Sequence, residues 1–359
     1  MELLVLNTSF ESVAVVDVFE SCIWTDRYRQ CGDFEIYTPM DVSLLAFLKP
    51  DYYLWSQDSE HTMIIETLNI ETDTENGAHL KVEGRSLESI LDRRIIWGQK
   101  VLKGNLQDEI EKLLNETIIS PSIAERKISN FVFQKTDDPT ITALTIDAQY
   151  TGDILYDVIK NLCEDNKIGF KIVLNDQNEF VFSLYTGKNR SYDQIENPYV
   201  IFSPSYENII NSNYLESKKS LKNVTLVAGE GEGASRRTTI VGSGKGLERR
   251  ELFTDARDIS SDTGDNHLSD SEYMNQLVQR GKENLSENIA TKTFEGEVEA
   301  TQMFKYNSDF FIGDIVQIEN EYGHTGKAYI SEFIMSQDKN EISNYPTFET
   351  IQEEGESEQ

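Results

Sequence analysis

Residues 19–37 read FESCIWTDRYRQCGDFEIY, and this stretch decides how the chain begins to fold. Successive side chains of a strand point to opposite faces, so one face is expected to carry Cys22, Trp24, Asp26 and Tyr28. The triplet Cys31-Gly32-Asp33 is a turn signal, because glycine adopts positive φ at little cost. The stretch therefore predicts two antiparallel strands around a short loop, within residues 19–38, with their aromatic side chains in a core.

A second stretch, residues 82–97, reads VEGRSLESILDRRIIW. It follows Asn76-Gly77, the strongest hairpin signal in the chain, which separates residues 62–71 from residues 78–83. These two segments are expected to pair as strands. Ser86 has the side chain of an N-cap, and the residues expected on the apolar face of a short helix after it are Leu87, Ile90 and Leu91.

Two consecutive arginines, Arg93 and Arg94, follow this short helix. They could form ion pairs within the chain at the helix end, where the helix dipole favours positive charge. They could also clamp a carboxylate of a partner, which a guanidinium does with two parallel hydrogen bonds. Both interpretations stay open, and the candidate interface residues are Arg27, Arg93, Arg94 and Trp97.

The composition argues against a membrane protein and against a secreted one. The chain has 359 residues and a mass of 41.0 kDa, which is material for roughly two to four domains. It holds no run of about 18 apolar residues, so we expect no membrane span. The N-terminus lacks a basic segment and a long apolar one, so we expect synthesis in the cytoplasm without a secretory signal.

Nothing in the sequence predicts a metal or cofactor site. The three cysteines and four histidines are scattered at spacings that match neither a disulfide framework nor a zinc site. Residues 242–246 read GSGKG, which lacks the spacing of a phosphate-binding loop. We therefore expect no cofactor, no metal and no catalytic residues, and we expect Cys163 to lie in a core.

The net charge of −30, from 63 acidic and 33 basic residues, would repel nucleic acid. One explanation is solubility, since acidic surfaces keep proteins dispersed. Another is that the protein lines a conduit for DNA, because an acidic wall offers no binding sites to a passing phosphate backbone. Composition does not separate these two explanations.

The order of predicted elements indicates an α+β, mainly β chain with four parts. Residues 1–100 are β-rich, residues 101–205 mix helices and strands, and residues 206–350 are β-rich again with a helix inserted at 269–290. Residues 351–359 form an acidic tail that is expected to be disordered. The helices of the second part are expected after Asn105 and after Thr151-Gly152-Asp153, and a last strand pair within residues 311–333.

The two stretches together resemble the N-terminal region of the tail-tip hub proteins of siphophages and prophages, which are also called tail-associated or minor structural proteins. The resemblance is most specific at residues 20–37 and 83–97. It continues in order through residues 236–250, the 269–290 helix, and Phe311-Ile312-Gly313-Asp314, which looks like a Gly-Asp strand start of that family.

Hub proteins of this kind resemble the central hub of contractile baseplates. The resemblance implies two tube-like β-barrel domains, at 1–100 and 206–350, with the α+β domain between them. It implies a homotrimeric ring with pseudo-sixfold symmetry at the tail tip of a virion, through which DNA passes without specific binding. The implied partners are the distal tail protein, the tape-measure protein, and downstream fibre or receptor-binding proteins.

Two alternatives to a structural hub stay open. The first is a tail-associated peptidoglycan hydrolase, which would need placed catalytic groups. Larger members of the family continue into a hydrolase or receptor-binding region, whereas this sequence stops at Gln359, so we expect no lysin activity and no enzyme. The second is a carbohydrate-binding tail module, suggested by sixteen tyrosines and three tryptophans.

Overall fold

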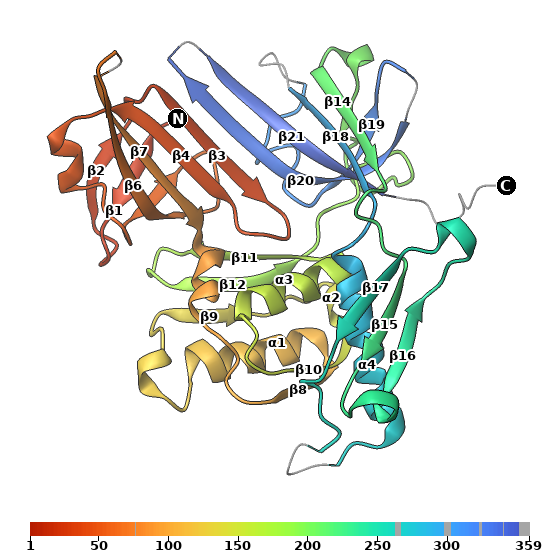
Figure 1. Ribbon diagram of the computed structural model, residues 1–359. Coiled ribbons are helices and arrows are strands. Elements are labelled where there is room, and N and C mark those ends of the chain that lie inside the picture. The colour runs from red at the N-terminus through yellow and green to blue at the C-terminus, as the bar shows by residue number, and fades with distance from the viewer. Residues whose placement is uncertain (76, 263–266, 298–302, 323–324, 340, 352–359) are drawn as a thin grey trace.

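The computed structural model describes residues 1–75, 77–262, 267–297, 303–322, 325–339 and 341–351. Most of its strands belong to one large sheet, drawn across the top of Figure 1. These strands are β1 (Leu3–Leu6), β2 (Ser12–Val16), β3 (Ser21–Arg27), β4 (Asp33–Pro39), β5 (Tyr53–Ser56), β6 (Met63–Asp73), β7 (Gly77–Ser86), β13 (Ile201–Phe202), β14 (Ile210–Ser217), β18 (Thr291–Glu297), β19 (Ile315–Glu319), β20 (Thr325–Asp338) and β21 (Ile342–Thr350).

The first motif folds as predicted, into two antiparallel strands. Residue pairs such as Trp24 and Phe34 lie opposite each other in the β3–β4 ladder. The predicted face is also correct, because the side chains of Cys22, Trp24, Asp26 and Tyr28 are all buried whereas Ile23 is exposed. The alternation in the sequence thus identified the side of the sheet that faces the core.

The second motif also folds as predicted. Strands β6 and β7 pair antiparallel along their length, with Gly77 at positive φ at the start of β7; Asn76 itself lies outside the described residues. Ser86 is the N-cap of a 3-10 helix, η2 (Leu87–Arg93), although its hydroxyl accepts a hydrogen bond from the amide of Gly32 rather than from its own helix. The buried face of η2 includes Leu87, Ile90 and Leu91.

Strands from the two ends of the chain share this sheet and its core. β20 pairs antiparallel with β19 over its first residues and with β3 over its last, while β21 lies along its other side. Trp24 and Phe34 accordingly pack in one core cluster with Phe202 and Phe348. Among the described residues the pairings form an open path from β14 to β2, with β19 and β13 branching from β20. The mainly β, α+β class is confirmed, and the tube-like barrel layout and its domain boundaries stay predictions.

Below the large sheet in Figure 1 lies an α+β segment with its own core. The helix predictions hold here: the Asn105 side chain caps the first long helix by accepting from the amide of Asp108. Cys163 is buried in this core, as expected. The elements are β8 (Lys100–Asn105), α1 (Leu106–Leu114), β9 (Phe131–Gln134), α2 (Pro139–Thr142), β10 (Thr145–Tyr150), α3 (Leu155–Asp165), β11 (Gly169–Leu174) and β12 (Phe180–Tyr185).

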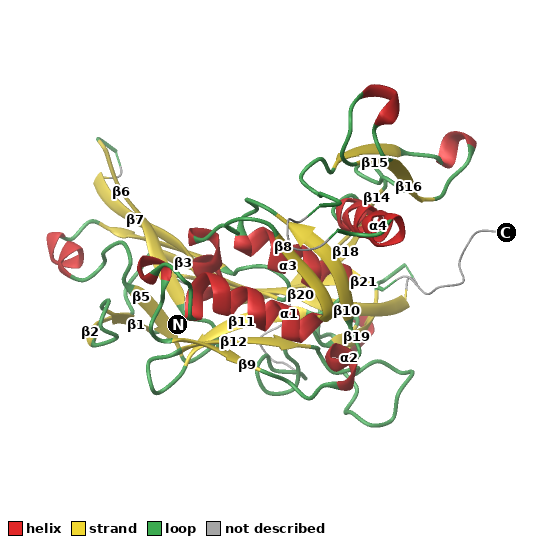
Figure 2. Cartoon of the chain, turned by 90° about the horizontal axis from the view of Figure 1, so that it is seen from below, coloured by secondary structure: helices red, strands yellow, loops and turns green. Residues whose placement is uncertain are grey.

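The predicted 269–290 helix is α4 (Asp270–Ser286), and Ser269 and Glu272 form a capping box at its start. It packs against a three-stranded sheet of β16 (Thr238–Gly242), β15 (Val224–Ala228) and β17 (Glu251–Asp255), as Figure 2 shows for β15 and β16. On its other side it contacts α3 and β10. The helix therefore joins this small sheet to the α+β segment.

The remaining helical turns are short. They are the 3-10 helices η1 (Val42–Ala46), η4 (Ala124–Arg126), η5 (Pro204–Tyr206), η6 (Gly233–Ser235) and η7 (Gly246–Glu248), and the π-helix η3 (Asn115–Ile119). Within the described part of the chain, no helix has the length and apolar character needed to cross a membrane. The expected acidic tail lies outside the described residues, apart from Ile351.

Candidate functional site

Tyr28, the last residue of the first motif's buried face, is the point where three parts of the chain meet. Its ring lies against Gly169 at the start of β11 and against Gly313 before β19. A Cβ added at either glycine would lie 2.4 Å from Cε2 of the ring, closer than any side chain tolerates. Gly313 also has a φ of +87°, which disfavours other residues. Both positions therefore require glycine.

Asp314 fixes the segment that crosses next to Gly313. This buried carboxylate accepts hydrogen bonds from the amide of Lys188 at 2.6 Å, from Nε of Arg190 at 2.6 Å and from the amide of Phe311 at 3.1 Å. Gly187 passes so close that a Cβ there would lie 1.9 Å from the carbonyl oxygen of Gly313. The Gly-Asp strand start thus anchors the connection that leaves β12. We call Tyr28, Gly169, Gly187, Gly313 and Asp314 the Tyr28 joint.

Asp26 collects hydrogen bonds from distant parts of the chain on the same buried face. It accepts from Nε1 of Trp24 at 3.1 Å, from the hydroxyl of Ser59 at 2.8 Å and from the hydroxyl of Tyr306 at 2.8 Å. Burial raises the pKa of Asp26, while the charge of His61 and these donors act in the opposite direction. The carboxylate thus ties β3 to the 303–310 segment, which lies 280 positions further along the chain.

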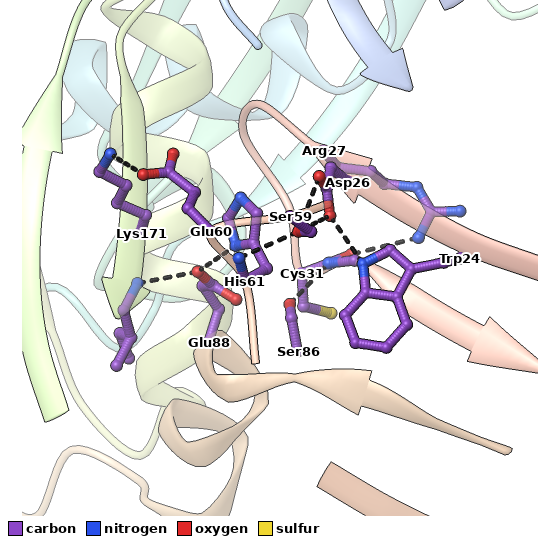
Figure 3. A network of polar contacts seen from close by, with 12 residues as sticks. Trp24, Asp26, Arg27, Cys31, Ser59, Glu60, His61, Ser86, Glu88 and Lys171 are labelled. Carbon is purple, nitrogen blue, oxygen red and sulfur yellow. Dashed lines mark hydrogen bonds and ion pairs between the residues drawn. The ribbon is translucent and has the colours of Figure 1, made fainter. Parts of the chain in front are cut away.

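His61 and Glu88 form a buried charge pair beside Asp26 (Figure 3). Nδ1 of His61 lies 3.3 Å from Oε1 of Glu88. Burial alone would lower the pKa of His61, but the carboxylates of Glu88 and Asp26 raise it to about 9, so the ring is charged at neutral pH. Glu88 also accepts from the amide of Ile172 at 2.8 Å, which satisfies a donor on the edge strand β11.

Further contacts connect the large sheet to the α+β segment. Lys171 on β11 forms an ion pair with Glu60 at 2.7 Å, and the amide of Cys31 donates to the hydroxyl of Tyr156 on α3 at 3.0 Å. The side chains of Asp26, His61 and Glu88 are 0%, 2% and 1% exposed. Among the described residues, Nε2 of His61 and Oε2 of Glu88 have no hydrogen-bond partner. The geometry is suited to holding segments together. Among the described residues, no group of three or more His, Cys, Asp and Glu side chains is placed to hold a metal.

The four residues singled out from the sequence lie in two places. Arg27 lies at the β3–β20 seam and forms ion pairs with Asp33 and Glu332, both at 2.6 Å. Arg93, Arg94 and Trp97 lie close together in the sequence at and after the end of η2. Their assignment as interface residues stays a prediction.

Sequence reasoning did not single out Asp26, His61 or Glu88 as members of a site. Asp26 carried a usable signal, because a carboxylate on the apolar face of an alternating strand requires buried donors. His61 and Glu88 carried none, since their partners come from segments that no local pattern brings together. The Gly313-Asp314 motif was noticed, but its contacts with Tyr28 and Arg190 depend on the fold.

Residues 2–348 match the family model described as Siphovirus ReqiPepy6 Gp37-like protein. The chain belongs to this family of siphovirus tail proteins. The resemblance inferred from the two N-terminal motifs is therefore confirmed at the level of the tail protein family. No curated protein matches the chain.

Solved structures of prophage tail proteins share the fold of this siphovirus tail protein. The 43 kDa tail protein of prophage MuSo2 from Shewanella oneidensis is 10% identical, with a TM-score of 0.59 and 97% and 98% of the two chains covered. The tail protein from Neisseria meningitidis is 11% identical, with a TM-score of 0.58 and coverage of 97% and 95%. The prophage tail protein gp18 from Listeria monocytogenes is 11% identical, with a TM-score of 0.54 and coverage of 98% and 95%.

Proposed function

We propose that this tail protein is the hub of the tail tip, a non-enzymatic ring that closes or extends the tail tube. The observation that carries the proposal is the sheet shared by the two ends of the chain through the β3–β20 ladder. Each copy thus supplies two β-rich segments as one rigid unit. Three copies would place six such segments around an axis, which suits the joining of a sixfold tube to a threefold tip.

The Tyr28 joint supports this role because a ring under load needs segments that keep a fixed angle. Glycine contacts and enclosed ion pairs hold the α+β segment against the sheet without a deformable interface. In this proposal the two β-rich segments are the tube-like domains. The α+β segment, and α4 with the three-stranded sheet of β15, β16 and β17, face neighbouring tail components. Those neighbours are the distal tail protein, the tape-measure protein, and fibre or receptor-binding proteins.

The net charge of −30 per chain fits a DNA conduit. Three copies concentrate this charge around one axis, and the repulsion between exposed charges falls off over about 8 Å at physiological salt. We propose that carboxylates outnumber Lys and Arg on the wall of the channel, so that DNA slides past without binding. A neutral or basic wall in a reconstruction of the tail tip would contradict this part of the proposal and leave the ring untouched.

The copy number in virions tests the ring directly. Quantitative mass spectrometry with isotope-labelled peptides is expected to find three copies of this chain per virion, with the major tail tube protein in the same digest as the internal reference. A reconstruction of the tail tip is expected to place the chain around the channel. A single copy per virion, or a position outside the tube, would overturn the hub.

The alternative of a peptidoglycan hydrolase has a separate test. We propose that the purified chain clears no zone in a peptidoglycan zymogram under conditions in which a known lysozyme does. A clear zone that disappears when one carboxylate is changed to its amide would establish an enzyme instead.

A further inference from the structure

One surface of the molecule combines crowded arginines with exposed apolar side chains. Ile95 and Ile154 form an isolated antiparallel bridge there. The guanidinium of Arg126 lies 4.8 Å from the ring centroid of Trp97 and donates to the carbonyl of Ile95 at 2.6 Å. We call Arg94, Ile95, Trp97, Arg126 and Ile154 the arginine–tryptophan surface.

The guanidinium groups of this surface have no carboxylate partner among the described residues. Arg94 donates to the carbonyl of Arg126 at 3.0 and 3.2 Å and to that of Arg93 at 2.9 Å. Burial is the main cause that lowers the pKa of Arg94, and the neighbouring charges of Arg126 and Arg93 add to it. Arg93 itself pairs only with Asp51, an exposed carboxylate.

Such an arrangement is unusual in this chain, which has almost twice as many acidic as basic residues. Every described arginine other than Arg94, Arg126 and Arg250 lies within ion-pair distance of a carboxylate. Two of these three exceptions lie on the arginine–tryptophan surface. The guanidinium groups of Arg94 and Arg126 therefore stand without a described carboxylate partner in a chain that holds 63 acidic residues.

The apolar part of the surface points to protein as the partner. Ile95, Trp97 and Ile154 are 44%, 53% and 38% exposed. Interfaces are enriched in tryptophan and arginine, which combine a large apolar area with directional donors. A tryptophan whose face carries a guanidinium also presents cation and ring as one rigid unit.

We propose that the arginine–tryptophan surface binds a carboxylate-bearing surface of the next copy of this chain. Copies that each carry −30 repel one another, so a contact between them needs cations that the chain has not already paired. A closed ring uses two different surfaces of each copy. Acidic residues outnumber basic ones in this chain, 63 to 33, so we expect the second surface to carry carboxylates. The inference rests on the proposed ring and names the surface through which it forms.

Photo-crosslinking in assembled tails tests which partner covers the surface. A photoreactive phenylalanine analogue replaces Trp97 in the full chain, virions are assembled and irradiated, and mass spectrometry identifies the product. We expect a crosslink between two copies, attached close to Asp or Glu residues. A product with a different tail protein, or virions that hold three copies but give no crosslink between them, would overturn the proposal while leaving the hub in place.

A charge reversal with a matched control tests the electrostatic part. Arg126→Glu and Arg250→Glu change the net charge equally. Both arginines lack a carboxylate partner within the described part of the chain, and both donate to backbone carbonyls, Arg250 to that of Lys218. Incorporation of each variant is measured against wild-type chain in mixed infections. We expect Arg126→Glu to lower incorporation at least about tenfold and Arg250→Glu less than about twofold.

The two variants distinguish the possible failures. Equal loss in both would mean general repulsion between copies and would overturn a specific surface. Incorporation of both variants at the wild-type level would also overturn a specific surface. Circular dichroism and the melting temperature of each purified variant show whether Arg126→Glu is folded; should it unfold, Trp97→Ala replaces it as the probe, with the same expected loss. Fewer or more than three wild-type copies per virion would instead count against the ring itself.

Discussion

The α+β segment meets its two neighbours in different ways. At the Tyr28 joint, glycine backbone lies directly against an aromatic ring, and the Arg190–Asp314 ion pair is enclosed. At α4, the contacts include the exposed ion pair Lys103–Glu272 at 2.8 Å and an exposed hydrogen bond from Nδ2 of Asn161 to Glu287 at 2.8 Å. The same contact includes the buried carboxyl of Glu283, which accepts from the hydroxyl of Tyr150 at 2.6 Å. Figure 1 shows both neighbours, the large sheet above and α4 to one side.

The difference teaches which contact can change. Atoms already at van der Waals distance leave no room for another atom, so the Tyr28 joint allows one arrangement. Exposed polar side chains exchange partners with water at little cost, so the α4 contact depends on conditions such as pH and salt. We therefore expect substitutions at the joint to act on folding and substitutions at α4 to act on its pH dependence.

The largest effect is expected from a glycine series at the joint. Gly313→Ala adds a Cβ that would lie 2.4 Å from the Tyr28 ring and places alanine at a φ of +87°. We expect a loss of about 3 kcal/mol or more in unfolding free energy, or failure to fold, because overpacking and backbone strain add. Urea unfolding of purified protein measures it.

Substitutions at two further glycines distinguish overpacking from backbone strain as the cause of the loss in unfolding free energy. Gly169→Ala meets the same ring at 2.4 Å without positive φ, so it isolates overpacking and should cost about 1–3 kcal/mol. Gly326→Ala has nothing within 4 Å and no positive φ, so it should stay within about 0.5 kcal/mol. Equal effects at all three positions would show that the contacts with Tyr28 do not decide the result.

The second prediction concerns the enclosed ion pair. Asp314→Ala removes three hydrogen bonds and leaves Arg190 buried without its carboxylate. We expect a loss of about 3–5 kcal/mol, since an uncompensated buried charge is costly. The double variant Arg190→Met/Asp314→Ala should recover part of it, and urea unfolding of the four proteins completes the cycle. A double variant less stable than Asp314→Ala would contradict the explanation by an uncompensated charge on Arg190.

The sequence predicted the elements that local signals specify. The hairpins β3–β4 and β6–β7 and the helix α4 with its Ser269 cap follow from alternation, turn residues and capping, which act over a few positions. The same holds for α1 and α3, whose apolar faces repeat at helical spacing.

Other features could not be predicted, because they depend on contacts between distant segments. The β3–β20 ladder joins residues more than 300 positions apart, and no local pattern specifies it. Strand β21 contains Pro346, a residue that argues against a strand, although it lies opposite Phe333 in the sheet. Strand β17 alternates weakly and pairs parallel with β15, and the buried partners of Asp26 follow only from the fold.

The third prediction concerns pH at α4. Burial raises the pKa of Glu283 to about 7, and the charge of Asp165 on α3 adds to the increase. The hydrogen bonds from Tyr150 and Gln279 and the charge of Arg280 on the same helix lower the pKa but do not offset burial. The folded chain therefore holds a proton that the unfolded chain has lost between about pH 4.5 and 7. This carboxyl contributes stability at the lower pH that is lost as pH rises through 7.

Melting temperatures of wild type and Glu283→Gln across pH 4.5–8 measure this contribution. The amide keeps an acceptor for Tyr150 and cannot ionise. We therefore expect the melting temperature of the variant to rise relative to that of wild type as pH rises, and the difference between the two melting temperatures to level off above pH 7. Comparing the two proteins cancels the titration of the other carboxylates. A difference that does not change with pH would show that Glu283 is ionised throughout this range.

The smallest effect is expected at an ion pair of the same chemistry as Arg190–Asp314 but exposed. The side chains of Arg93 and Asp51 are 46% and 64% exposed at a distance of 3.0 Å, against 7% and 3% at 2.6 Å for Arg190 and Asp314. Solvent screens the exposed pair, and ordering two long side chains offsets its attraction. We expect Arg93→Ala to change the unfolding free energy of the isolated chain by less than about 0.5 kcal/mol, with no dependence on whether Asp51 is present.

The double-mutant cycle with Asp51→Ala, measured by urea unfolding at low and at physiological salt, checks this expectation. A coupling above about 1 kcal/mol would mean that exposure does not decide the strength of ion pairs in this chain, and would remove the basis for contrasting the enclosed joint with the exposed contacts of α4.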